Sequence, residues 1–289
     1  MSESDHSHRQ LGNVIDNPWR RLREFTDARI GLGRAGISLP TSELLAFQLS
    51  HAQARDAVHF PLDVSALRAE LQALQGMSAD TPLLHLLSQA TDRVTYLQRP
   101  DLGRKLDDAS RQQVVALPAA ANATPSDLAI VIVDGLSSLA VQQNAAPFLA
   151  ELLPLLQSQQ QLWSLAPLTV VEQGRVAIGD DIGELINARM VLLLIGERPG
   201  LSSPDSLGLY LTWNPRSGLN DAARNCISNV RPAGLAYAEA ARRVVYLMNE
   251  ARRLQLSGVN LKDRTRDSVL EQDGKSSHFL IADQATAPK

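Results

Sequence analysis

The sequence predicts an α/β protein in which a doubly wound, mostly parallel sheet follows a small helical subdomain. The first observation is the unbroken apolar run at residues 190–195, which a turn containing Gly196, Pro199 and Gly200 follows at once. A strand without polar alternation is typical of a parallel sheet covered by helices on both faces. The second observation is that apolar runs alternate with helical periodicity from residue 93 onward. This alternation is the pattern of βαβ units and favours a Rossmann- or flavodoxin-like arrangement.

Composition limits the class of protein. The chain has 289 residues, of which 44% are hydrophobic, enough to bury a sizeable core. Its formal net charge of −3 gives no electrostatic reason to expect nucleic acid or an anionic membrane as a partner. The single cysteine excludes an internal disulfide and fits a reducing compartment. The N-terminus has no apolar signal region, and no apolar run approaches the roughly 20 residues of a membrane helix. We therefore expect a soluble, cytoplasmic protein.

The pattern divides the chain into four regions. Residues 1–16 are polar and are predicted to form a disordered arm. Residues 17–92 are predicted to form the helical subdomain, with helices that begin at Pro18, after Pro40 and at Val64. Residues 93–261 are predicted to form the α/β domain. Residues 262–289 lose apolar periodicity, which indicates a flexible tail.

Three glycines in the N-terminal region resemble a G-x-G-x-x-G dinucleotide fingerprint: Gly31, Gly33 and Gly36. That fingerprint requires a strand before it and a helix that opens inside it. Here a predicted helix precedes the glycines, and Pro40 separates them from the next helix. We therefore interpret the segment as a loop.

Within the α/β domain the periodicity assigns seven strands and three helices. The predicted strands cover residues 94–97, 128–134, 168–172, 175–178, 190–195, 207–213 and 226–230. The predicted helices run from about 138 to 157, from 180 to 187 and from about 235 to 256. Ligands of open α/β sheets bind outside the carboxyl ends of the strands. The loops after Asp134, Ile195 and Val230 are therefore the expected ligand crevice.

Glu197 is the first candidate site residue because it directly follows the strand at residues 190–195. The alternative is a solvated loop residue whose carboxylate caps a helix. Cys226 is a possible thiolate nucleophile, but no histidine lies within tens of residues, and a small buried core residue is the alternative.

No nucleophile elbow, P-loop, H-E-x-x-H or C-x-x-C occurs, so we expect no catalytic residue and no metal ligand. A crevice without catalytic groups indicates a subunit that holds a cofactor for a partner. A stand-alone nucleotide- or flavin-binding module and a purely structural protein are the alternatives.

Five segments of the chain form a recognisable set: GRAG at 33–36, RPDLGRKL at 99–106, IVDGLSS at 132–138, IGERPGLSSPDSLGLYL at 195–211 and RNCISNVRPAGLAYAEAA at 224–241. With these segments the chain resembles the small (light) subunit of ethanolamine ammonia-lyase. They occur in the family's order over roughly residues 17–260. The cobalamin motif D-x-H-x-x-G, whose histidine binds cobalt, is absent.

The resemblance implies an adenosylcobalamin enzyme that converts ethanolamine to acetaldehyde and ammonia through a radical. It implies a large-subunit partner that carries most of the reacting groups, in a hetero-oligomer. It implies that the cofactor keeps its own base on cobalt and lies between the two subunits. The family's cobalamin contacts fall on Val176, Glu197 and Cys226. Many members have a longer amphipathic N-terminal extension that is associated with a bacterial microcompartment, so encapsulation is left open here.

Overall fold

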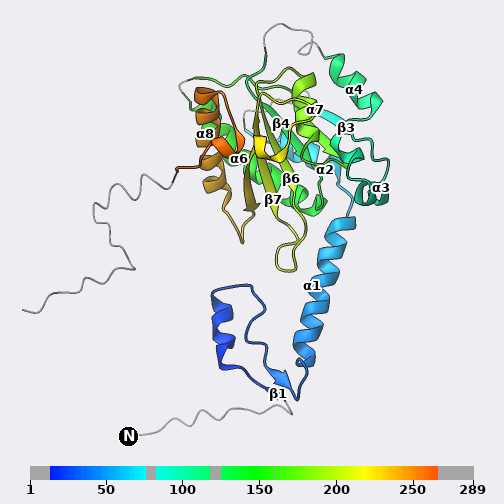
Figure 1. Ribbon diagram of the computed structural model, residues 1–289, viewed down its shortest axis with the longest axis vertical. Coiled ribbons are helices and arrows are strands. Elements are labelled where there is room, and N and C mark those ends of the chain that lie inside the picture. The colour runs from blue at the N-terminus through cyan, green and yellow to red at the C-terminus, as the bar shows by residue number, and fades with distance from the viewer. Residues whose placement is uncertain (1–13, 76–82, 118–124, 160, 266–289) are drawn as a thin grey trace, which may run out of the picture.

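The computed structural model describes residues 14–75, 83–117, 125–159 and 161–265, and Figure 1 shows an α/β body from which one long helix extends. The body contains a six-stranded sheet. In spatial order its strands are β3 (Leu83–Leu87), β5 (Leu168–Glu172), β4 (Ala129–Val133), β6 (Met190–Gly196), β7 (Leu207–Trp213) and β8 (Arg224–Val230). The prediction of an α/β fold is confirmed.

The sheet is mixed, with a parallel part and an antiparallel edge, where the sequence predicts a mostly parallel sheet. Strands β3, β5, β4 and β6 run parallel, whereas β7 is antiparallel to both β6 and β8. The connections at residues 197–206 and 214–223 are too short for the crossover of a dozen or more residues that parallel neighbours require. The doubly wound, Rossmann- or flavodoxin-like arrangement stays a prediction.

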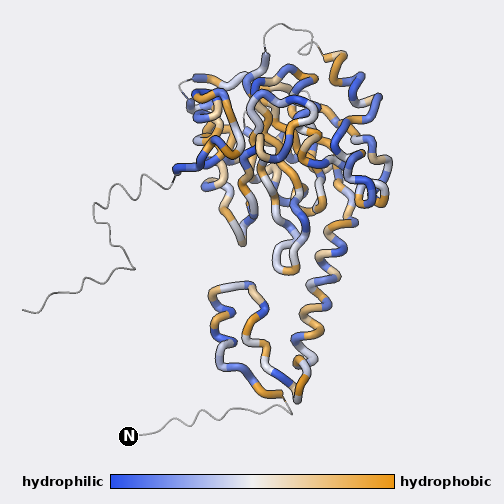
Figure 2. Tube along the Cα trace, in the orientation of Figure 1, coloured by the Kyte–Doolittle hydropathy of each residue, from blue (hydrophilic) through white to orange (hydrophobic). Residues whose placement is uncertain are grey.

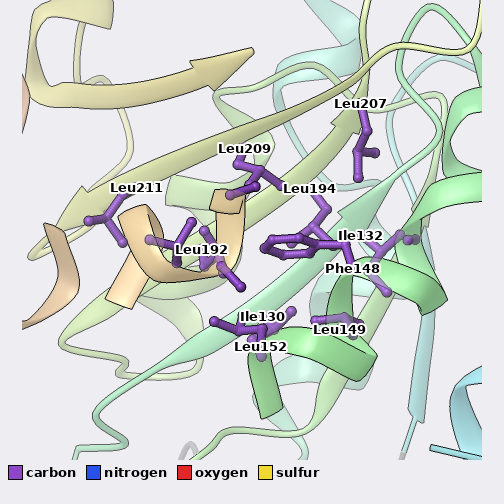
Figure 3. Packing of buried hydrophobic residues seen from close by; sticks show 14 of the residues in the cluster. Ile130, Ile132, Phe148, Leu149, Leu152, Leu192, Leu194, Leu207, Leu209 and Leu211 are labelled. Carbon is purple, nitrogen blue, oxygen red and sulfur yellow. The ribbon is translucent and has the colours of Figure 1, made fainter. Parts of the chain in front are cut away.

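Helices cover both faces of the sheet. On one face lie α6 (Ser138–Gln157), α8 (Tyr237–Leu254) and α2 (Val64–Gln72). Figure 3 shows Phe148 of α6 among leucines and isoleucines of β4, β6 and β7 on this face. On the other face lie α7 (Ile178–Leu185) and α4 (Asp108–Val115). Every residue of β4 and β6 is buried, as their unbroken apolar runs predict.

Three local predictions differ from the structure. Residues 94–97 belong to a helix, α3 (Arg93–Gln98), because Asp92 caps it by accepting the N–H of Thr95. Residues 175–177 lead through a turn into α7, which begins at Ile178, so no strand forms here. Strand β3 was not predicted, and with α2 it packs into the α/β body although both precede residue 93.

The N-terminal segment lies outside the body (Figure 1). Strand β1 (Val14–Ile15) pairs with β2 (Arg34–Ala35), so the glycine segment contains a short strand within the predicted loop. Between them lies the 3-10 helix η1 (Pro18–Glu24), and α1 (Thr41–His59) joins the segment to the body. Arg23 donates to both carboxylate oxygens of Glu43 at 3.0 and 2.9 Å, which fixes η1 to α1.

Three further 3-10 helices are η2 (Leu102–Arg104), η3 (Asp221–Ala223) and η4 (Gly258–Asn260). Among the described residues, no helix combines the length and apolar character that crossing a membrane requires. The predicted disordered arm and flexible tail fall mainly at 1–13 and 266–289, outside the described residues.

Candidate functional site

A pocket of about 390 Å³ lies at the edge of the sheet where β4, β5 and β6 end. The parallel register brings these ends together, because Val133 pairs with Val171 on one side and with Ile195 on the other. The lining residues are Tyr96, Leu136, Arg175, Val176, Ile195, Gly196, Glu197, Arg198 and Tyr210. The pocket therefore coincides with the edge at which the sequence predicts a ligand.

Val176 lies in the loop between β5 and α7, which is held close to the end of β4. The N–H of Gly174 donates to Oδ1 of Asp134 at 3.2 Å. Burial raises the pKa of Asp134 to about 6, although neighbouring backbone N–H groups and Arg93 lower it. A Cβ at Gly174 would lie 2.5 Å from Cγ1 of Val133, so only glycine allows this approach. These contacts fix the position of Val176 at the pocket.

The base of the pocket is Tyr96, whose ring lies close to two arginines. The guanidinium carbons of Arg93 and Arg175 lie 4.8 and 4.1 Å from the ring centre, within the range of cation–π contacts. The Tyr96 hydroxyl donates to the carbonyl of Gly174 at 3.1 Å, and burial raises the pKa of Tyr96, so the phenol stays protonated. The tyrosine therefore supports the pocket and has no free polar group for a ligand.

Glu197 begins the loop after β6, and one of its carboxylate oxygens is already used. Oε2 accepts a hydrogen bond from the Ser206 hydroxyl and another, at 3.1 Å, from the N–H of Asn229. The end of β6, the start of β7 and the end of β8 are thus joined. Oε1 accepts no hydrogen bond from the described residues. A Cβ at position 208 would lie 2.9 Å from this oxygen, so Gly208 leaves room for it. The alternative of a helix-capping carboxylate is wrong.

Cys226 lies on β8 and is exposed, so the alternative of a buried core residue is wrong. In the register it is opposite Tyr210 of β7, which lines the pocket. Burial and, after it, the neighbouring groups of Cys226 and Glu197 raise the pKa of Tyr210, which keeps its hydroxyl a donor. Sγ of Cys226 lies 3.7 Å from Oγ of Ser228, on the same face of the strand. The pocket therefore continues, through the half-buried Tyr210 of β7, onto the exposed side of β8 that carries Cys226 and Ser228.

The structure brings two of the three sequence-predicted site residues into one pocket, Val176 and Glu197, and places Cys226 on the adjoining strand face. Sequence reasoning missed Arg175 and Tyr210. Arg175 directly precedes Val176, and Tyr210 lies on the polar side of an alternating strand; both signals were available in the sequence.

The arrangement offers groups that can bind a ligand. The pocket lining contains no cysteine, serine or histidine. Within the described part of the chain, no group of three or more histidine, cysteine or acidic side chains could hold a metal ion. The site instead offers apolar surface, one free carboxylate oxygen and two arginine side chains.

Comparison with known proteins gives consistent matches. Residues 16–262 match the family described as ethanolamine ammonia-lyase light chain (EutC). A protein of Ralstonia nicotianae named ethanolamine ammonia-lyase small subunit is 59% identical over 268 residues, which cover 93% of this chain and 96% of the relative. Proteins with the same name from Pseudomonas fluorescens SBW25 and Pseudomonas aeruginosa PAO1 are 58% and 56% identical. They cover 93% and 92% of this chain, and the matches span 96% and 95% of these relatives.

Proposed function

The chain belongs to the ethanolamine ammonia-lyase light-chain family, and from that premise we propose that it holds adenosylcobalamin, in its base-on form, against a large subunit. The observation that carries the proposal is that the pocket continues, past Tyr210 of β7, onto the exposed side of β8. Val176 and Glu197 line the former, and Cys226 lies on the latter. Positions far apart in the sequence thus form one surface.

The chemistry of this surface fits a corrin. Val176 and Ile195 present apolar atoms, and the absence of a side chain at Gly208 leaves Oε1 of Glu197 accessible. A carboxylate oxygen accepts hydrogen bonds from amide N–H groups such as those around a corrin ring. When bound, the cofactor supplies radical chemistry by homolysis of its cobalt–carbon bond. The residues of this chain bind and orient the ring and exclude water from its surface.

A large-subunit partner is supported by apolar side chains on the N-terminal segment. The exposed fractions of Trp19, Phe25 and Ile37 are 67%, 84% and 106%. Figure 2 shows apolar residues along this segment and along α1, outside the α/β body. Large apolar side chains that are exposed together on one segment are typical of a protein interaction surface. The reacting groups, on this proposal, are contributed by that partner.

Co-expression with a candidate large subunit tests the proposal. The assembled complex should bind adenosylcobalamin and release acetaldehyde from ethanolamine, whereas this chain alone should do neither to a measurable extent. Flavin or nucleotide binding by the isolated chain, or a complex that binds no cobalamin, would favour the alternative of a stand-alone binding module.

Substitution of Glu197 tests the site within the complex. Glu197→Ala leaves a ligand N–H without its acceptor, which costs about 1–3 kcal/mol, or about ten- to a hundredfold in cofactor affinity. Turnover at saturating cobalamin should fall far less, since the reacting groups lie elsewhere. Glu151→Ala is the matched control: it removes an exposed carboxylate from α6, away from the pocket, so affinity should stay close to wild type. Equal affinities for Glu197→Ala and wild type would remove Glu197 from the site.

A further inference from the structure

Arg175 is held rigidly at the wall of the pocket. Its N–H donates to the carbonyl of Gly103 at 2.7 Å, and Nη2 donates to the carbonyl of Tyr96 at 3.0 Å. The guanidinium also lies on the Tyr96 ring. A Cβ at Gly103 would lie 2.9 Å from Cγ of Arg175, so the glycine makes room for the side chain to cross this loop. The guanidinium is therefore positioned before any ligand binds.

The charge of Arg175 is not compensated within the described residues. Other arginines with little exposure have a carboxylate within 4 Å: Arg93 with Asp134, Arg224 with Asp180, Arg231 with Asp205 and Arg252 with Asp127. No such ion pair joins Arg175 to a described carboxylate, and its buried Nε has no hydrogen-bond partner there. A half-buried guanidinium with unused donors is costly unless a ligand supplies the acceptor.

Glu197 presents the complementary group in the same pocket. It is tethered through Oε2 and offers Oε1, yet it makes no ion pair with Arg175. The pocket thus holds two guanidinium donors, Arg175 and the exposed Arg198, and one free acceptor, Oε1 of Glu197. A carboxylate placed between Arg175 and Glu197 would be repelled by Glu197, and an ammonium group there would be repelled by Arg175. A primary amide presents both an N–H donor and a C=O acceptor and carries no charge, so it suits both groups.

We propose that Arg175 and Glu197 together recognise one primary-amide side chain of the corrin, and thereby select the amidated cofactor against its carboxylic-acid forms. The guanidinium of Arg175 donates to the amide carbonyl, and Oε1 of Glu197 accepts from the amide nitrogen. This inference rests on the proposed function and adds to it a positioning residue, Arg175, and a basis for specificity.

The first test measures cofactor affinity in the assembled complex, in the absence of ethanolamine, from the absorption change of adenosylcobalamin. Arg175→Met keeps the apolar part of the side chain and removes the donors, and should weaken binding about ten- to a hundredfold. The Michaelis constant for the coenzyme should rise with little change in kcat. The control Arg104→Met removes an exposed guanidinium from η2, which does not line the pocket, and should leave affinity unchanged.

The second test does not depend on the stability of the Arg175 variant. A set of cobalamin monocarboxylic acids, each with one side-chain amide hydrolysed, is compared with cobalamin. The wild-type complex should bind one member of the set at least about tenfold more weakly than cobalamin. In Glu197→Gln, the N–H of Asn229 requires the amide oxygen at the Oε2 position, which directs the new NH₂ group to the pocket. That variant should lose or reverse the discrimination against the same acid.

The outcomes separate the inference from the proposed function. A wild-type complex that binds no adenosylcobalamin contradicts the proposed function. A wild-type complex that binds cobalamin and all the acids equally, or whose discrimination is unchanged in Glu197→Gln, contradicts the inference alone. Unchanged coenzyme affinity in a folded Arg175→Met complex contradicts it as well.

Discussion

The parallel and antiparallel parts of the sheet differ in what covers them. Strands β4 and β6 are buried on both faces, between α6 and α8 on one side and α7 on the other. Strand β8 has its apolar side, with Ile227 and Val230, in the core beneath α8, whereas Cys226 and Ser228 are exposed. The parallel part supplies rigidity, and the antiparallel edge supplies accessible surface. The candidate site lies where the two meet.

The largest expected effect concerns the ion pair that fixes the antiparallel edge to α7. Arg224 of β8 is buried and pairs with Asp180 of α7, and burial raises the pKa of Asp180 against the lowering effect of Arg224. Arg224→Met leaves a buried carboxylate without its partner, which should reduce the free energy of unfolding by about 3–5 kcal/mol. Urea denaturation of the variant and of the wild-type protein measures this loss in the free energy of unfolding. Arg242→Met, which removes an exposed pair with Glu239, should cost less than about 1 kcal/mol. Similar losses of stability in Arg224→Met and Arg242→Met would contradict the burial of the ion pair between Arg224 and Asp180.

A smaller effect depends on pH and tests burial at the end of the parallel part. Because the pKa of Asp134 is raised to about 6 from 3.8, the folded state binds a proton more tightly than the unfolded chain. The resulting stabilisation is complete below pH 3.8 and is lost as the pH rises through 6, in total on the order of 3 kcal/mol. Asp134→Asn has no such titration and keeps an acceptor for Gly174. Its stability relative to wild type should therefore increase between pH 4 and pH 7. A difference that does not vary with pH would mean that Asp134 is solvated.

The difference between the parallel part and the antiparallel edge of the sheet also explains which strands the sequence could predict. The runs at 190–195 and 128–134 predict buried strands, and in the structure β6 and β4 are covered by helices on both faces. The direction of β7 was missed although Leu207, Leu209 and Leu211 alternate with Gly208 and Tyr210, a pattern typical of a strand with unlike faces. Strand β3 was missed because His85 interrupts its apolar run; in the structure Nε2 of that histidine lies 2.7 Å from Oε1 of Glu172 on β5.

The candidate site was predictable in part. Glu197 follows from its place after a buried strand, whereas Val176, and Cys226 as a cofactor contact, came from the family resemblance. The use of Oε2 by Ser206 and Asn229 depends on three chain segments that meet only in the folded protein. The same holds for Arg175, whose unpaired guanidinium is visible only when the carboxylates around it are known.

The central claim is that the exposed face of the antiparallel edge is covered by the cofactor. Cys226 is the only cysteine in the chain and is exposed, so its alkylation can be followed by mass spectrometry of its peptide. In the complex with a large subunit, iodoacetamide should label Cys226 readily without cofactor, and saturating adenosylcobalamin should slow labelling by about tenfold or more. Labelling at the same rate with and without bound cobalamin would contradict the claim.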